Sequence, residues 1–177
     1  MVLLKPAEPE RMPHVRWLIR RDMQEVMDIE NRSFEFPWTE DEFLAQLRNR
    51  NCIGAVYESP SDLIHGFMIY ELHADCLRLL NLAVAPEVRR TGVGQTMIQR
   101  LIDKLSHQRR RFIDVEVRET NLSAQLFLSQ AGFRAESVLR RYHDDTIEDG
   151  ILFRYSVPID PMQAGVDGSN RISQYFE

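Results

Sequence analysis

Cysteines, long apolar runs and regularly spaced metal ligands are scarce in this sequence of 177 residues. Its only cysteines, Cys52 and Cys76, each lie inside an apolar stretch and form no Cys-x-x-Cys pair, so we expect two buried thiols. The five histidines show no metal-ligand spacing with one another or with the cysteines, and no metal site is expected. No apolar run approaches the roughly 20 residues that span a bilayer, which excludes membrane insertion.

Positive charge is also in the minority. The 22 lysines and arginines are outnumbered by 27 aspartates and glutamates, which gives a formal net charge of -5. This balance argues against nonspecific binding of nucleic acid. The basic run at 109–111 is interpreted as a solvated helix end. Residues 1–13 mix Lys, Glu, Arg and Pro without the apolar core of a signal peptide, so we expect a cytoplasmic protein.

The composition predicts one ordinary globular domain. Hydrophobic residues make up 44% and charged residues 28% of the chain, and its length suits a single sizeable core. We expect the domain to cover residues 15–157, after a lead-in at 1–14. Residues 158–177 are dominated by Pro, Gly, Asp, Ser and Asn and are expected to form a flexible tail.

Hydrophobic periodicity and turn residues predict a mixed series of strands and helices. Strands are expected at 14–21, 52–58, 63–72, 76–84, 112–118, 133–142 and 151–157, helices at 22–30, 39–47, 92–105 and 121–131, and a Pro37 loop at 31–38. This order predicts a three-layer α/β domain with a mixed, largely antiparallel central sheet and helices on both faces. The strands at 76–84 and 112–118 are joined by a helix and should be parallel neighbours.

Several residues indicate where a predicted helix begins or which side of a predicted element faces the core. Asp22 is placed to cap the first helix, and Thr39 with Glu42 has capping-box spacing at the second. Glu116 alternates with three apolar residues of its strand and therefore points away from their row. The inner side of the helix at 121–131 is expected to hold Leu122, Leu126, Phe127 and Ala131.

The segment Arg89-Arg90-Thr91-Gly92-Val93-Gly94 lies between a buried strand and an amphipathic helix. Its glycines leave room for a ligand to approach backbone N–H groups, and the first N–H groups of a helix favour a phosphate. The alternative is a plain tight turn with two solvated arginines. A P-loop is excluded because Gln95 follows Gly94 in place of Lys, and a Rossmann fingerprint because Met97 replaces its third Gly.

Four segments together resemble the GNAT superfamily of N-acetyltransferases, and the resemblance covers about residues 15–157. They are Ile29-Glu-Asn-Arg-Ser-Phe-Glu-Phe-Pro-Trp-Thr39, residues 80–94, Glu116-Val-Arg-Glu-Thr-Asn121 and Ala131-Gly-Phe133. Within the superfamily the sequence looks most like the RimI-type ribosomal-protein-alanine N-acetyltransferases and related protein N-terminal acetyltransferases. The predicted order of strands and helices is also that of the GNAT fold.

The resemblance implies an acetyl-CoA site around the glycine-containing turn. By motif position, the residues implied to contact acetyl-CoA are Leu82, Ala83, Val84, Arg89, Arg90, Thr91, Gly92, Val93, Gly94, Gln95 and Asn121. Taken without the resemblance, Asn121 is more simply a helix cap and residues 82–84 ordinary core. Phe36, Pro37 and Trp38 are implied to form part of the acceptor-peptide groove, for which packing is the alternative explanation.

Glu116 resembles the family's general base. An amine arrives mainly as ammonium and must lose a proton before it attacks a thioester, which suits a carboxylate acting directly or through water. The general-acid Tyr of many members has no counterpart, because its position holds Leu128, which cannot donate a proton. Tyr142 is a candidate for the acceptor site and a weaker candidate for the acid, with a buried strand Tyr as the alternative.

The sequence therefore predicts transfer of acetyl from acetyl-CoA to the α-amino group of a protein or peptide N-terminus, directly within a ternary complex. A ribosomal protein is one candidate acceptor, and no metal, nucleic acid or membrane partner is expected. Two alternatives stay open. One is acetylation of a small amine, since one fold serves many acceptors. The other, motivated by Leu128, is a noncatalytic acyl-CoA-binding module.

Overall fold

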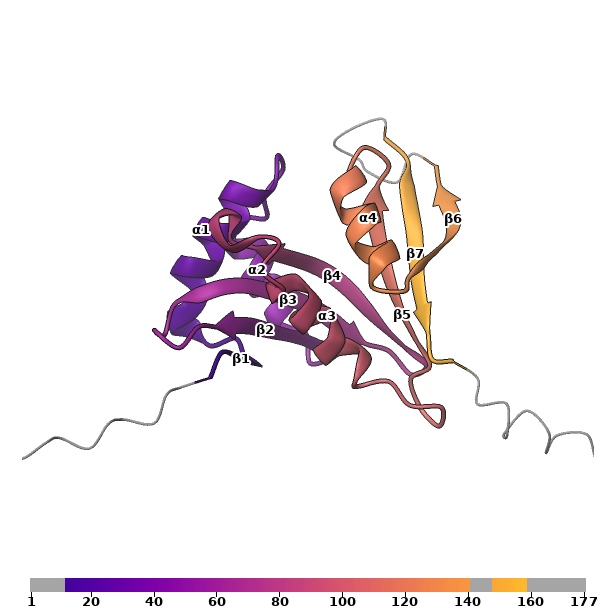
Figure 1. Cartoon of the computed structure of the whole chain (residues 1–177), viewed down its shortest axis with the longest axis horizontal. Coiled ribbons are helices and arrows are strands. Elements are labelled where there is room, and N and C mark those ends of the chain that lie inside the picture. Colours follow the sequence, from indigo (N-terminus) through magenta and orange to yellow (C-terminus); the bar gives the residue numbers. More distant parts are fainter. Residues whose placement is uncertain (1–11, 141–147, 159–177) are drawn as a thin grey trace, which may run out of the picture.

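A computed structural model describes residues 12–140 and 148–158 of the chain. The seven strands of this part form one sheet in the order β1-β2-β3-β4-β5-β7-β6. They are β1 (His14–Trp17), β2 (Cys52–Glu58), β3 (Ile64–Leu72), β4 (Cys76–Val84), β5 (Phe112–Arg118), β6 (Arg134–Leu139) and β7 (Gly150–Ser156). Only β4 and β5 are parallel among these neighbours. The mixed, largely antiparallel sheet and its parallel central pair are confirmed (Figure 1).

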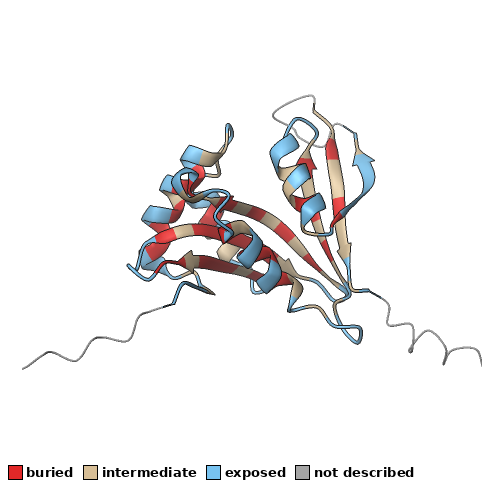
Figure 2. Ribbon diagram, in the orientation of Figure 1, coloured by how far each residue is buried: buried red, intermediate tan, exposed pale blue. Residues whose placement is uncertain are grey.

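Helices cover both faces of this sheet. The α-helices of the described residues are α1 (Met23–Ser33), α2 (Glu40–Arg48), α3 (Val93–Ile102) and α4 (Leu122–Gln130). On one face, a buried cluster that includes Met97 and Leu101 packs α3 against the sheet. On the other face, a second cluster that includes Ile29, Phe43 and Phe67 packs α1 and α2 against it. Buried residues follow the strands between the helices (Figure 2), so the predicted three-layer architecture is confirmed.

The capping box of α2 and the burial of one cysteine are confirmed. Thr39 Oγ1 accepts the Glu42 N–H at 3.3 Å, and Glu42 Oε2 accepts the Thr39 N–H at 2.7 Å, which completes the capping box of α2. Cys52 is buried, as predicted, whereas Cys76 at the start of β4 is only half-buried.

The first elements end at other residues than the sequence predicts. β1 stops at Trp17 instead of residue 21, and a 3-10 turn at Arg20–Asp22 leads into α1. α1 continues through Ser33 and so takes up part of the predicted loop at 31–38. Pro37 restricts only the residue directly before it, and therefore does not prevent helix at 31–33.

The predicted inner face of α4 is confirmed for Phe127 and Ala131 and wrong for Leu122 and Leu126. Leu122 and Leu126 are 65% and 64% exposed, whereas Leu128 is buried and Phe127 and Ala131 are partly buried. α4 covers the outer arm of the sheet, and the edge strand β6 of that arm is itself almost entirely exposed. The arm is too narrow to cover the whole apolar side of the helix.

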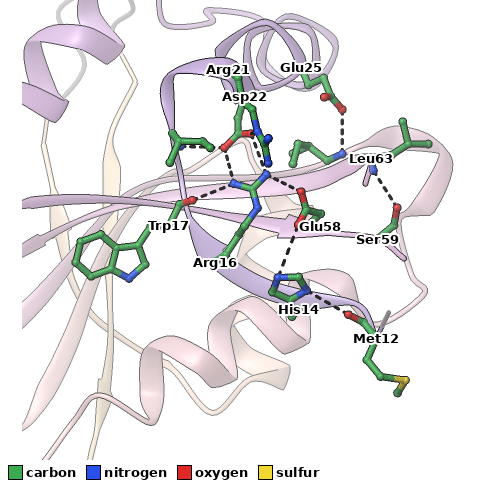
Figure 3. Close-up of polar contacts among 12 residues, drawn as sticks. Met12, His14, Arg16, Trp17, Arg21, Asp22, Glu25, Glu58, Ser59 and Leu63 are labelled. Carbon is green, nitrogen blue, oxygen red and sulfur yellow. Dashed lines mark hydrogen bonds and ion pairs between the residues drawn. The ribbon is translucent and has the colours of Figure 1, made fainter. Parts of the chain in front are cut away.

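A compact ionic cluster ties β1 to the start of α1 and to β2 (Figure 3). The Arg16 guanidinium donates to both carboxylate oxygens of Asp22, at 2.6 and 2.9 Å, and to Glu58 Oε1 at 2.7 Å. Asp22 also accepts the Ile19 N–H at 2.9 Å. The prediction that Asp22 caps α1 is therefore wrong, because these two partners engage its carboxylate and it makes no side-chain cap bond to α1.

Hydrogen bonding within this cluster favours ionised carboxylates. Burial raises the pKa of Asp22, but the hydrogen bonds from Arg16 and from the Ile19 N–H outweigh burial, so the net pKa is lowered. The hydrogen bond from Arg16 likewise lowers the pKa of Glu58. A carboxyl group whose pKa is lower in the folded state stabilises the fold above its unfolded pKa. That stabilisation is lost as the pH falls through the folded pKa.

We expect Asp22→Asn to lower the free energy of unfolding by about 2–4 kcal/mol at pH 7, because it removes the main partner of the largely buried Arg16 charge. Asp28→Asn is a matched control, since it removes only an exposed 2.9 Å ion pair with Arg32, and should cost less than about 1 kcal/mol. The wild-type stability should fall below about pH 4, and less steeply in Asp22→Asn. Urea unfolding at pH 7 and at acid pH measures both effects; equal losses in the two variants would contradict the prediction.

Candidate active site

A cleft lies where β4 and β5 separate. Their parallel pairing runs only from Cys76 opposite Phe112 to Leu79 opposite Val115. Beyond that point β4 stays paired with β3, and β5 stays paired with β7. The two strands therefore diverge from a shared base, β4 toward α1 and β5 beneath α4 (Figure 1). The cleft between them measures about 210 Å³ and is lined by residues 79–82 and 115–118, with Phe34, Asn121, Ala124, Phe127 and Leu128.

A β-bulge in β4 decides which side chains face which layer. In the pairing of β3 with β4, Tyr70 lies opposite Leu79 and Ile69 lies opposite Asn81. Leu80 is therefore the extra residue of β4. Simple alternation would place Leu79 and Asn81 on the same face. Instead Leu79 joins the α3 cluster, whereas Asn81 donates to a carboxylate of α1. The bulge turns the second half of β4 over, next to the cleft.

Glu116 lies on β5 at this cleft, as the sequence alternation predicts. Its neighbours in the strand, Val115 and Val117, are buried in the α3 cluster, whereas the Glu116 side chain faces the other way and is 19% exposed. Arg78 of β4 donates from Nη2 to Glu116 Oε1 across the strand pair. This ion pair fixes the position of the carboxylate. Sequence analysis did not single out Arg78, although a charged residue inside an apolar strand is itself a signal.

The glycine-containing turn presents the N-terminus of α3 as predicted. The first N–H that the helix satisfies belongs to Thr96, which donates to Gly92 O at 2.9 Å, so the N–H groups of residues 93–95 precede the intrahelical ladder. Gly92 has φ +96, and a Cβ there would meet no atom within 4 Å. The space beside it is open. These features fit a pyrophosphate, because unpartnered N–H groups and the helix dipole attract an anion.

Other residues of the turn have structural contacts of their own. Arg90 has φ +62, a left-handed conformation that helps to reverse the chain. Arg89 donates from Nε to Val84 O at 3.0 Å and from Nη2 to Ser33 Oγ at 2.9 Å, so it ties the turn to β4 and α1. Thr91 Oγ1 donates to Val88 O at 2.7 Å. Their contacts with acetyl-CoA stay predictions.

The remaining predicted acetyl-CoA contacts fall into two groups. Leu82 lines the cleft and packs with Val84 on the α3 face, while Ala83 is buried on the α1 face. Asn121 also lines the cleft, and its Oδ1 accepts the Ala124 N–H at 3.1 Å. It is therefore a helix cap of α4, as the simpler interpretation holds, and its contact with acetyl-CoA stays a prediction.

The segment predicted to form the acceptor groove lies on the α1 side of the cleft. Phe36 is 48% exposed and packs under the Arg118 guanidinium, 5.1 Å from its ring centroid. Trp38 is half-buried and packs edge-on against Phe43, with 5.3 Å between ring centroids. Packing thus explains Trp38, whereas Phe36 is accessible to a ligand. Tyr142, the other residue predicted for the acceptor site, lies outside the described residues.

Leu128 occupies the position at which many GNAT enzymes carry a Tyr. It is 3% exposed and belongs to the core beneath α4, while also lining the cleft. It is a packing residue and cannot act as an acid. A larger depression of about 540 Å³ lies between α4 and β6 and is lined by Leu122 and Leu126, among others. None of the predicted site residues lines it.

Within residues 12–140 and 148–158, no three His, Cys, Asp or Glu side chains are grouped so that they could hold a metal ion. The helices in the same residues are all too short or too polar to cross a membrane.

Comparison with known proteins identifies the family. The acetyltransferase (GNAT) family model matches residues 23–133, and the chain belongs to this family. It is an acetyl-CoA-dependent N-acetyltransferase. The noncatalytic alternative is thereby set aside. Acetyl-CoA is the co-substrate of this enzyme.

Individual relatives are similar along most of the chain. The ribosomal protein bS18-alanine N-acetyltransferase of Escherichia coli is 29% identical over 133 residues, which cover 74% of this chain and 88% of the relative. The enzyme of the same name from Salmonella typhimurium is 29% identical over 132 residues, or 71% and 88% of the two chains. The crystal structure of the ribosomal-protein-S18-alanine N-acetyltransferase from Escherichia coli superposes with a TM-score of 0.73 at 26% identity, covering 84% of this chain and 96% of the other.

We expect Gly92→Asp to weaken acetyl-CoA binding at least about 100-fold, because a carboxylate would stand among N–H groups that suit pyrophosphate. The substitution also strains a left-handed backbone position. Gly132→Asp is the matched control, since Gly132 also has a positive φ, +92, but follows the C-terminal end of a different helix, α4. It should lose stability and keep its affinity. Calorimetry on both folded variants measures this, and an unchanged affinity in Gly92→Asp would refute the assignment of the turn.

Proposed function

We propose that this enzyme acetylates the α-amino group of a protein N-terminus by direct transfer within a ternary complex. The observation that carries the proposal is Glu116, a carboxylate held by Arg78 at the cleft between β4 and β5. The acceptor class is supported by the relatives, which are named as alanine N-acetyltransferases of ribosomal protein bS18. The N-terminus of that protein is therefore the first acceptor to test.

Direct transfer is supported by the lack of a nucleophile that could carry the acetyl group. No Cys, Ser, Thr, Tyr or Lys is among the described residues that line the cleft. Cys52 lies elsewhere in β2, and burial raises its pKa to about 11, so its thiol is a poor nucleophile at neutral pH. The acceptor nitrogen would then attack the thioester carbon itself.

In the proposed reaction, acetyl-CoA binds near α3 on one face of the sheet and the acceptor binds on the α1 side. The N-terminus of α3 would hold the pyrophosphate of acetyl-CoA, and Leu82, Ala83 and Val84 would contact its pantetheine arm. Acetyl-CoA supplies the activated acetyl group. Glu116 would take a proton from the amine, directly or through water, while a C–N bond forms and the C–S bond breaks. The thiolate can leave without an acid at Leu128, because a thiol pKa is only about 8.5.

The acceptor would approach from the α1 side. Phe36 with Arg118 forms an apolar and cationic edge there, and Pro37 and Trp38 continue the same segment. Tyr142 is proposed to contact the acceptor. Its hydroxyl is a weaker candidate for the acid because it does not occupy the family's acid position.

A panel of acceptors tests the proposal. We expect peptides with a free α-amino group, including one with the bS18 N-terminus, to be acetylated, and peptides with a blocked N-terminus and an internal Lys to be inert. Mass spectrometry of a cell extract incubated with isotopically labelled acetyl-CoA would locate the acetyl group on its natural acceptor. Turnover confined to small amines in both experiments would refute a protein acceptor.

We expect Glu116→Gln to reduce turnover about 100-fold at neutral pH, because an amide is a far poorer base of nearly the same shape. Acetyl-CoA affinity should persist, and part of the rate should return at high pH, where more of the amine is already neutral. Glu119→Gln changes an exposed carboxylate just beyond β5 and should stay close to wild type. Full activity of Glu116→Gln across the pH range would remove the base assignment.

A further inference from the structure

Asn81 lines the cleft and has a buried acceptor atom that the proposed reaction does not yet use. The residue is 8% exposed and lies in the second half of β4, which the bulge turns toward α1. Its Nδ2 donates to Glu30 Oε2 at 3.1 Å. Its Oδ1 is buried and accepts no hydrogen bond from any described residue. Asn81 also lines the cleft together with Glu116.

Glu30 determines which way the Asn81 amide points. Its side chain is almost fully buried, and Oε1 accepts the Trp38 N–H at 2.8 Å. Burial raises the pKa of Glu30, while the hydrogen bonds from Trp38 and Asn81 oppose that rise. The net pKa of Glu30 is raised; in its ionised form the side chain only accepts, so it selects the NH₂ group of Asn81 and leaves the amide oxygen on the side away from Glu30. The orientation therefore follows from hydrogen-bond polarity.

Buried amide oxygens in native proteins are normally satisfied, and one without a protein partner beside a cleft can take its hydrogen bond from a water or from a ligand donor. The donor must be small, because the cleft measures about 210 Å³. It must also come close to Glu116, which lines the same cleft from β5. An amine has this chemistry, since it offers N–H groups and, once it has lost the proton of its ammonium form, a lone pair for attack.

We propose that Asn81 Oδ1 accepts an N–H from the α-amino group of the acceptor and holds that nitrogen between Glu116 and the thioester carbon. The inference rests on the proposed function and adds a substrate-positioning residue to it. A neutral amide oxygen accepts an N–H from an ammonium and, less strongly, from a neutral amine. It therefore keeps its hydrogen bond while Glu116 removes another proton. Leu82, the next residue, begins the segment predicted to contact the pantetheine arm.

The first test compares Asn81→Leu with wild type on two peptides that differ only in the α-amino group. One peptide begins with alanine and the other carries a propanoyl group, which replaces the amine with hydrogen. With CoA bound, wild type should bind the alanyl peptide about tenfold more tightly, as expected for a hydrogen bond to a charged group. Asn81→Leu should lose most of that preference. The peptide KM should rise by a similar factor, with acetyl-CoA affinity unchanged.

The second test reverses the amide without removing it. In Glu30→Gln, the Trp38 N–H still requires an oxygen, so the Gln NH₂ group must face Asn81 and turn the Asn81 oxygen toward itself. The cleft then receives N–H groups, which repel an ammonium. This variant should also lose the preference for the alanyl peptide. Glu25→Gln is the matched control, because Glu25 lies on the same helix and accepts the Ile64 N–H at 2.9 Å away from the cleft. It should keep the preference.

The outcomes separate the two proposals. Loss of the preference in Asn81→Leu and Glu30→Gln, with acetyl-CoA affinity retained, supports the inference; if Asn81→Leu fails to fold, Glu30→Gln decides alone. A folded Glu30→Gln or Asn81→Leu that keeps the wild-type preference overturns the role of Asn81 and leaves the proposed function standing. A wild-type enzyme that neither prefers nor acetylates the alanyl peptide overturns both.

Discussion

The separation of β4 from β5 is the constraint on which the site depends. A parallel strand pair normally continues to the end of its shorter member, since unpaired backbone groups inside a protein are costly. Here pairing stops after Leu79 and Val115, although both strands run on. Each strand keeps a partner on its outer side, β3 or β7, so the two arms of the sheet remain intact. Only the inner backbone edges are left for a ligand.

The bulge at Leu80 and the open cleft act together. Opening the sheet provides backbone groups and space, but a regular β4 would direct Asn81 to the α3 face with Leu79. The extra residue turns Asn81 toward α1, where Glu30 can bind it. Side chains from the α1 layer and the proposed acetyl-CoA site near the α3 turn can then meet at one opening. Bulges next to active sites commonly redirect a side chain in this way.

The sequence predicts what depends on local pattern and misses what depends on distant partners. The capping box at Thr39, the turn at Gly92 and the alternation around Glu116 are each encoded within a few residues. Asp22 was misassigned because Arg16 of β1, which also binds Glu58 of β2, engages its carboxylate. The exposure of Leu122 and Leu126 depends on the width of the outer arm of the sheet. The sequence of the helix alone does not reveal that width. Arg78 and Asn81 carried a weaker signal, as polar residues in an apolar strand.

Glu30 couples the acceptor segment to the opening of the sheet. One carboxylate oxygen binds the backbone N–H of Trp38 and the other binds Asn81. The segment that begins with Phe36 is thereby positioned relative to β4 by two hydrogen bonds to a nearly rigid, buried group. A displacement of this segment would weaken one bond or the other, and a buried donor left unpaired is costly. In the proposed reaction, the same carboxylate fixes both where the acceptor enters and which atom of Asn81 it meets.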